Sequence, residues 1–424
     1  MVDVYDALVL DALLRQSLVT VRSLGKRGYR VAALENCTAP AFSSRWCHHG
    51  FIYAANEGSQ SYLDYLEQAL DRTGARVLIP SSDGTIALIR RHLAHLEQRT
   101  QIALAKEPAL AIAVNKERTL SIAARLGLSV PRSVTVGSVE TVPSALKTIG
   151  LPLVVKPVES WAVGDQSGLQ GVRVASRLVT TAAEAYNAVE ELTAQGGTVL
   201  FQQYLSGRRE AVSLLYANGK VHARFAQWAK RTEPPLGGTS VLRQSIAVPE
   251  DSGSQAERLV REINLEGYAE VEFRRDSVGV PYLMEINPRL SASVEIAVRS
   301  GIDFPYLLYQ WASGEQIDTV TSYRTGNWMR YLKGDMMTTI AALQQRGRPG
   351  VPPPIRSILA FCSSFLHPMD YDYLDWHDPA PALKATVSFT RSWLGEIVSK
   401  HSTVGAGLAL ALPRLESRRK VASA

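Results

Sequence analysis

The chain has 424 residues, 46% of them hydrophobic, which is enough for roughly two to four packed units with real cores. Lysine and arginine exceed aspartate and glutamate by six charges, a mild excess that suits phosphate-bearing ligands. No strand or helix interleaves basic and aromatic residues as a nucleic-acid-reading surface does, so we expect no nucleic-acid partner.

The spacing of the cysteines and the length of the apolar runs bear on the cellular compartment of the protein. Cys37, Cys47 and Cys362 form no Cys-x-x-Cys pair, which argues against a disulfide framework or a zinc knuckle. The beginning of the chain lacks a signal-peptide pattern, and the apolar run at 357–366 is too short to span a bilayer. We therefore expect a cytoplasmic protein without a membrane partner.

The first hundred residues alternate short apolar runs with helical stretches. Predicted strands cover residues 7–11, 30–35 and 76–80, and predicted helices run to about Gly28 and from about Ser61. This alternation predicts an α/β unit on a parallel, doubly wound sheet, which we place at 1–112. The turn at 11–15 lacks the GxGxxG pattern, so a dinucleotide site is not expected.

Residues 80–84, Pro-Ser-Ser-Asp-Gly, end the last of these strands and begin a helix predicted over 85–96. Open sheets bind ligands at such places. Asp83 could face a substrate there, or Ser82 or Asp83 could simply cap the helix.

The rest of the chain divides at changes in pattern. We predict an α+β unit at 113–198, a strand-rich unit at 199–310 and a C-terminal extension at 311–424. The second unit contains a helix from Asn115, a strand at 151–156, a glycine-containing loop at 158–171, a strand at 171–175 and a helix at 182–194. The third contains strands at 199–204, 210–216 and 220–225 and a hairpin at 267–286, and the extension contains a helix at 382–400.

Glu272, Glu285 and Asn287 are the strongest candidates for chemistry. Period-2 alternation places Glu285 and Asn287 on one face of a strand, and hairpin pairing can bring Glu272 opposite them. Clustered carboxylates are costly to bury unless a cation lies between them, and Mg²⁺ held together with nucleotide phosphates meets that need. Arg289 would add charge for a transferred phosphoryl group. The alternative is a surface ion pair between Glu285 and Arg289.

With this hairpin in view, residues 1–310 resemble the ATP-grasp superfamily. The most specific match is Glu272 followed by the run Glu-Ile-Asn-Pro-Arg at 285–289. Residues 287–293 and the loop at 234–240 are most similar to the carbamoyl-phosphate-synthase-like branch and its predicted carboxylate-amine ligases. The resemblance implies an ATP-grasp fold with ATP and Mg²⁺ as cofactors, the metal being held by Glu272, Glu285 and Asn287.

The resemblance also implies an ATP-binding set. Its members are Lys116, Lys156, Gln202, Gln203, Tyr204, Leu205 and Glu210. The two lysines would hold phosphates, and the backbone of residues 202–205 would bind the adenine edge. Gln202 stands where the family more often has a glutamate. The loop at 158–171 corresponds to the family's phosphate cover, although Trp161, Val163 and Asp165 interrupt its glycines.

Arg231 and Arg243 flank the stretch where related ligases approach the γ-phosphate and the acyl substrate. Two guanidinium groups could hold a carboxylate or an acyl phosphate by paired hydrogen bonds. The alternative is a solvated loop with solubilising charges. We assign Arg231 and Arg243, with Arg289, to catalysis.

Together these features predict an ATP-dependent carboxylate-amine ligase that forms an amide or peptide bond through an acyl phosphate. Its partners would be a small-molecule carboxylate and an amine, and a homodimer is compatible with the sequence. Two alternatives stay open: a carboxylase or carbamoyl-phosphate-type enzyme that activates bicarbonate, and a catalytically silent nucleotide-binding protein.

Overall fold

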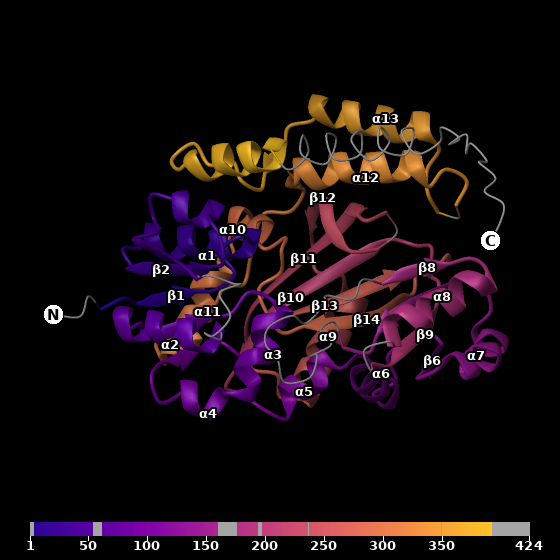
Figure 1. Ribbon diagram of the computed structural model, residues 1–424, viewed down its shortest axis with the longest axis horizontal. Helices are drawn as coiled ribbons and strands as arrows, with labels where there is room; N and C mark the ends of the chain where they lie inside the picture. Colours follow the sequence, from indigo (N-terminus) through magenta and orange to yellow (C-terminus); the bar gives the residue numbers. More distant parts are fainter. Residues whose placement is uncertain are drawn as a thin grey trace, which may run out of the picture.

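The computed structural model describes residues 4–53, 62–159, 176–193, 197–235, 237–348 and 350–391. It contains three sheets of five, seven and four strands. In Figure 1 the five-stranded sheet lies at the left, the four-stranded sheet at the lower right, and the seven-stranded sheet between them. None of the described helices has the length and apolar content needed to cross a lipid bilayer.

The N-terminal sheet is entirely parallel, with strand order β3-β2-β1-β4-β5, and confirms the predicted doubly wound α/β unit. Its strands are β1 (Ala7–Val9), β2 (Val31–Glu35), β3 (His49–Ile52), β4 (Val77–Ile79) and β5 (Gln101–Ile102). Its helices are α1 (Arg15–Lys26), η1 (Pro40–Ser43), α2 (Tyr62–Thr73), α3 (Asp83–Arg91), α4 (Leu93–Leu96) and α5 (Ala109–Val114). Strands β3 and β5 were not predicted, because one is largely exposed and the other has only two residues.

The four-stranded sheet is antiparallel, in the order β6-β9-β7-β8. Its elements are α6 (Lys116–Arg125), β6 (Ser133–Val136), η2 (Val139–Thr141), α7 (Val142–Ile149), β7 (Leu153–Pro157), β8 (Arg177–Val179), α8 (Ala182–Thr193) and β9 (Val199–Gln203). Because β9 pairs with β6 and β7, the predicted division at 198/199 is placed too early. Apart from Val158 and Glu159, the predicted phosphate cover and the strand at 171–175 lie outside the described residues.

The seven-stranded sheet has the order β14-β13-β10-β11-β12-β15-β16. Its strands are β10 (Arg209–Ala217), β11 (Lys220–Glu233), β12 (Thr239–Ile246), β13 (Gly267–Arg275), β14 (Pro281–Asn287), β15 (Trp328–Arg330) and β16 (Asp370–Tyr371), and α9 (Glu250–Glu262) packs on β10 and β13. The turn between β10 and β11 uses Asn218 and Gly219 at φ 52° and 72°, as tight hairpins require. The predicted C-terminal extension therefore contributes two strands, β15 and β16, to this sheet.

Four further helices follow β14. They are α10 (Glu295–Ser300), α11 (Phe304–Ser313), α12 (Leu332–Gln344) and α13 (Pro354–Ser363), with η3 (Ser364–Leu366), and residues 380–391 are also helical. Figure 1 shows α12 and α13 above the large sheet and the yellow end of the described chain above the N-terminal unit. The predicted helix at 382–400 therefore begins near its expected start and is described only to 391.

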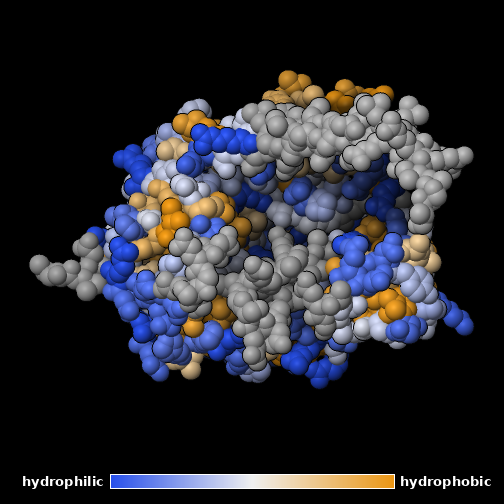
Figure 2. All heavy atoms as spheres, viewed as in Figure 1, coloured by the Kyte–Doolittle hydropathy of each residue, from blue (hydrophilic) through white to orange (hydrophobic). Residues whose placement is uncertain are grey.

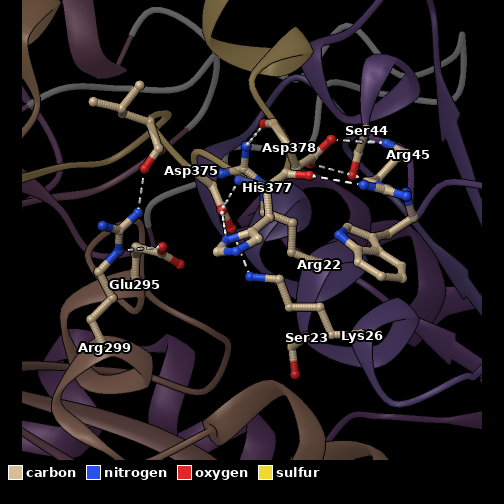
Figure 3. Close-up of polar contacts among 12 residues, drawn as sticks. Arg22, Ser23, Lys26, Ser44, Arg45, Glu295, Arg299, Asp375, His377 and Asp378 are labelled. Carbon is tan, nitrogen blue, oxygen red and sulfur yellow. Dashed lines mark hydrogen bonds and ion pairs between the residues drawn. The ribbon is translucent and has the colours of Figure 1, made fainter.

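The C-terminal segment is attached to the N-terminal unit by polar contacts, as Figure 3 shows. Asp378 accepts a hydrogen bond of 2.9 Å from Nε of Arg22, and Asp375 pairs with Lys26 at 2.6 Å. Arg299 of α10 donates to the carbonyl of Leu374 at 2.5 Å. The segment at residues 374–378 thus contacts both α1 and α10.

Apolar cores fix the N-terminal and large sheets to each other. One core joins Leu8 and Ile86 to Leu283 and Ile286, and a second runs from the other face of the N-terminal sheet to Phe304 of α11. The four-stranded sheet and its helices α7 and α8 form a third core of their own. A site between the first two units is therefore held by continuous packing.

Candidate functional site

The predicted acidic hairpin forms between β13 and β14. Glu272 lies directly opposite Glu285, and Glu270 lies opposite Asn287. Directly paired residues of an antiparallel sheet share a face, so these four polar side chains gather on one side of the hairpin. The pairing confirms the predicted convergence of Glu272, Glu285 and Asn287.

Glu272 is held by a neighbour that the sequence did not single out. Arg209 of β10 contacts both of its carboxylate oxygens, with Nε–Oε2 at 3.1 Å and Nη2–Oε1 at 2.5 Å. Asn287 Nδ2 donates to Glu272 Oε1 at 3.2 Å. Only the strand register, which places Ala211 beside Glu272, brings Arg209 within reach.

The charges of two lysines act on Glu285. Lys116 is the first residue of α6, whose N-terminus is capped by the side chain of Asn115, and its Nζ lies 3.6 Å from Glu285 Oε2. Lys156 comes from β7. Burial, with a contribution from the charge of Lys116, lowers the pKa of Lys156 to about 8. Burial alone would raise the pKa of Glu285, but the charges of Lys116 and Lys156 outweigh it and lower that pKa.

Arg289 is oriented by the N-terminal unit. Its Nε and Nη2 donate to the two carboxylate oxygens of Asp83 at 2.6 and 3.0 Å. Ser82, not Asp83, accepts the capping bond from the amide of Thr85 at the start of α3. Asp83 therefore joins the N-terminal sheet to the hairpin by a bidentate pair.

A cleft of about 300 Å³ lies at this junction between α3, α5, α6 and β14. Its wall includes Asp83, Lys116, Glu285 and Asn287. A second depression, visible in Figure 2, hollows the molecule between the C-terminal helices and the unit of the four-stranded sheet. The hairpin thus faces solvent-accessible space.

The predicted adenine linker follows β9. Gln202 lies on the same face of the four-stranded sheet as Lys156, and Gln203 bonds through its amide to the carbonyl of Arg132 at 2.9 Å. The carbonyl of Leu205 accepts a bond of 2.8 Å from Arg274. Among the described residues, nothing accepts a hydrogen bond from the backbone amides of Tyr204 or Leu205. Hydrogen bonds therefore fix both ends of the linker. The backbone amides of Tyr204 and Leu205 can donate hydrogen bonds to a ligand.

Glu210 is buried, and both of its carboxylate oxygens are already engaged. Arg275 donates to them at 2.7 and 3.0 Å, and Arg208 adds a contact at 3.0 Å. The structure thus gives Glu210 a structural partner on β13 in addition to its predicted nucleotide contact.

Arg231 and Arg243 are not placed as open substrate clamps. Arg243 is fully buried and pairs with Asp372, which Arg15 also contacts at 2.8 Å. Arg231 pairs with the buried Asp335 through Nε at 2.5 Å and Nη2 at 2.7 Å. We therefore revise both assignments: these side chains attach the C-terminal helices and the segment around Asp372 to the large sheet.

Glu270, a third carboxylate on the same face as Glu272, was not predicted from the sequence. Burial, and then the charge of Glu272, raises the pKa of Glu270 to about 7. The sequence does contain an indication of this position. Glu270 precedes Glu272 by two residues, and residues two apart in a strand lie on the same face.

Two carboxylates and an amide oxygen suit Mg²⁺, which takes few protein ligands and completes its shell with water and phosphate oxygens. Within the described ranges, no three acidic, histidine or cysteine side chains converge as a ready cage for a metal ion. Glu272, Glu285 and Asn287 therefore fit a magnesium ion that arrives with a nucleotide.

The large sheet matches a family model. Residues 196–334 match the family described as "ATP-grasp in the biosynthetic pathway with Ter operon". This range contains the acidic hairpin, the linker after β9 and all the strands of the large sheet except β16.

Curated relatives and solved structures are also similar. A D-alanine–D-alanine ligase of Stutzerimonas stutzeri is 26% identical over 220 residues, 47% of this chain and 64% of that protein. A probable alpha-L-glutamate ligase of Aeromonas salmonicida is 25% identical over 267 residues, 62% of this chain and 80% of that protein. The chain thus spans less than two thirds of the length of the first of these relatives. A biotin carboxylase structure from Campylobacter jejuni, in complex with β,γ-ATP, aligns with a TM-score of 0.61 at 16% identity, covering 76% of this chain and 74% of that chain.

Proposed function

We propose that the chain is an ATP-grasp enzyme, an ATP-dependent carboxylate-amine ligase that forms an amide or peptide bond, because residues 196–334 match an ATP-grasp family model. The ligases among its relatives support amide formation. The carboxylate and the amine would be small molecules.

One observation supports this proposal most strongly. Lys116 lies 3.6 Å from Glu285, and the charge of Lys156, from another element, acts on the same carboxylate beside the hydrogen-bonded Glu272 and Asn287. One buried and one half-buried lysine, together with a metal-ligand set in one place, match the charge pattern of a metal–triphosphate complex. A surface ion pair, the alternative for Glu285 and Arg289, does not account for it, because Arg289 pairs instead with Asp83.

In this proposal the protein holds positively charged groups and a metal ion against the phosphates of ATP. Glu272, Glu285 and Asn287 would hold Mg²⁺, which supplies positive charge against the phosphates when it is bound. Lys116 and Lys156 would bind phosphate oxygens, and the backbone of residues 202–205 would bind the adenine edge. Arg289, oriented by Asp83, keeps Nη1 outside that pair for the transferred phosphoryl group.

The reaction balances without a further co-reactant. A carboxylate oxygen of the substrate attacks the γ-phosphorus of ATP, the bond from that phosphorus to the bridging oxygen breaks, and ADP leaves. The amine nitrogen then attacks the acyl carbon, inorganic phosphate leaves, and the nitrogen loses one proton. Such chemistry depends on positioning and electrostatics more than on protein nucleophiles.

The test measures ADP release from MgATP with a panel of carboxylates that includes bicarbonate, with hydroxylamine present to trap an activated acyl group as its hydroxamate. We expect at least one organic carboxylate to raise ADP release and to yield a hydroxamate. ADP release with bicarbonate alone would favour a carboxylase-type activity. Tight ATP binding without stimulation by any carboxylate would overturn the ligase proposal.

Lys156 predicts how ATP binding depends on pH. Its pKa of about 8 means that the side chain is charged below pH 8 and loses its charge above it. If only the charged form binds phosphate, the apparent Kd for MgATP rises about tenfold between pH 7 and pH 9. Equilibrium titration at each pH measures this. Lys156→Arg, which stays charged, should flatten the dependence, and an unchanged slope in that variant would assign the effect to another group.

A further inference from the structure

Helix α3 borders the cleft of about 300 Å³ beside the hairpin along its whole length. The residues of α3 that line this cleft are Asp83, Ile86, Ala87, Arg90 and Arg91. The last four stand three, four, seven and eight positions after Asp83, which is the spacing of one helix face. At about 1.5 Å per residue, this face extends about 12 Å. The cleft therefore has a near end at Asp83, which is bound to Arg289, and a far end at Arg91.

Helix α5 borders the same cleft and runs in the opposite direction. Glu107, just before α5, pairs with Arg90 at the end of α3 at 2.7 Å. Lys116, just after α5, lines the cleft and lies 3.6 Å from Glu285 of the hairpin. The near end of the cleft thus contains residues proposed for phosphate and metal, whereas the far end is formed by charged side chains of the N-terminal unit.

Between these ends the lining of the cleft is apolar. It includes Ile86 and Ala87 of α3, and Ala113 and Val114 of α5. Ile86 and Ala113 are buried and belong to the core that joins the N-terminal unit to the hairpin. A ligand in this space would therefore have a hydrocarbon body held against a fixed wall, with its charged groups at the two ends.

The far end of the cleft has one positive charge in excess. Both oxygens of Glu107 are engaged, Oε1 by Arg90 Nε at 2.7 Å and Oε2 by the amide of Ala111 at 2.9 Å. The exposed guanidinium of Arg91 forms no ion pair or hydrogen bond with any residue in the described ranges. A guanidinium offers parallel N–H donors that match the two oxygens of a carboxylate. The far end is therefore suited to an anionic group.

The nucleotide of the proposed function does not occupy this end. The linker at 202–205 follows β9, and Lys156 lies on β7 of the same four-stranded sheet, to the right of α3 and α5 in Figure 1. A nucleotide bound to both would extend from the hairpin toward that sheet. The space along α3 is left for another ligand, and about 300 Å³ is at the small end of the range for ligand pockets.

We propose that the cleft along α3 takes the acyl donor and that Arg91 binds a second anionic group on it, so that the activated substrate is a small dicarboxylic acid. This assignment rests on the proposed ligase function. One carboxylate lies at the near end, beside Lys116 and the hairpin, and attacks the γ-phosphorus of ATP. The other stays at Arg91, within about 12 Å of the first, and is not activated. Arg91 is then a specificity-determining residue.

The experiment compares straight-chain dicarboxylates with monocarboxylates of the same carbon number in the hydroxylamine assay, so that no acceptor amine needs to be known. We expect the wild-type protein to prefer the dicarboxylate of best length by about 10–100-fold in kcat/KM, because only that donor supplies an anion to Arg91. Arg91→Gln should remove this preference by raising the dicarboxylate KM. Monocarboxylate turnover, and the Kd for MgADP from equilibrium titration, should stay within about twofold.

Two further variants complete the design. Arg99→Gln removes another arginine of the N-terminal unit, one that pairs with Asp71 and does not line the cleft, and should keep the preference. Ala87→Leu places a larger side chain in the middle of the cleft face and should lower kcat/KM for both classes of donor without changing the Kd for MgADP.

The outcomes separate the two claims. Equal use of both classes by the wild type, an undiminished preference in Arg91→Gln, or unchanged donor kinetics in Ala87→Leu would overturn the donor assignment and leave the ligase function standing. No hydroxamate from any donor would overturn the ligase function, and the donor assignment with it.

Discussion

Glu285→Gln is expected to lower carboxylate-dependent ADP release by at least about 10²–10³-fold, because it removes a charge that faces both lysines and the proposed metal. Glutamine keeps the shape of the side chain, and Glu285 is partly exposed, so the fold should survive. Lys156→Ala should cause a comparable loss by removing a phosphate-binding cation. Steady-state ADP release at saturating MgATP measures both effects.

The matched control is Glu315→Gln, whose side chain contacts Arg76 and Tyr29 and none of the proposed site residues. It should leave turnover unchanged within about twofold. Circular dichroism and thermal unfolding would show that each variant is folded. Wild-type turnover in both Glu285→Gln and Lys156→Ala would refute the site assignment.

Asp372→Ala is expected to cost about 3–5 kcal/mol of unfolding free energy, because it leaves two buried guanidinium groups without their anion. Arg243 and Asp372 have side-chain exposures of 0% and 1%, and Arg15 reaches the same carboxylate at 2.8 Å. Burial would raise the pKa of Asp372, yet the charges of Arg243 and Arg15 lower it, so the Asp372 carboxylate is ionised at neutral pH. Denaturant unfolding monitored by tryptophan fluorescence measures the loss.

For this stability prediction too, Glu315→Gln is the comparison, since exposed pairs contribute about 0–1 kcal/mol. If Asp372→Ala cost no more than this control, Arg243 would be free to serve a substrate, as its sequence position suggested. A large loss in Asp372→Ala would support the structural role of Arg243.

Local pattern was sufficient to predict the acidic hairpin. Alternation along 267–286 fixed which side chains share a face, and a directly paired Glu272 and Glu285 followed from the antiparallel geometry. The parallel N-terminal sheet was predictable for the same reason, since strand and helix periods alternate there. Short strands such as β5, and strands joined to distant segments such as β15 and β16, gave no local signal.

The sequence by itself therefore determined the hairpin carboxylates and the order of the units, because each depends on neighbours within one or two elements. The two lysines were predicted from the family resemblance. Only the tertiary structure determined which charged side chains pair with each other. The strand register brings Arg209 into contact with Glu272. Packing of the N-terminal unit against the large sheet brings Asp83 to Arg289. The C-terminal segment, which returns to the large sheet, brings Asp372 to Arg243. These contacts join residues 63 to 206 positions apart, and no periodicity reports on such distances.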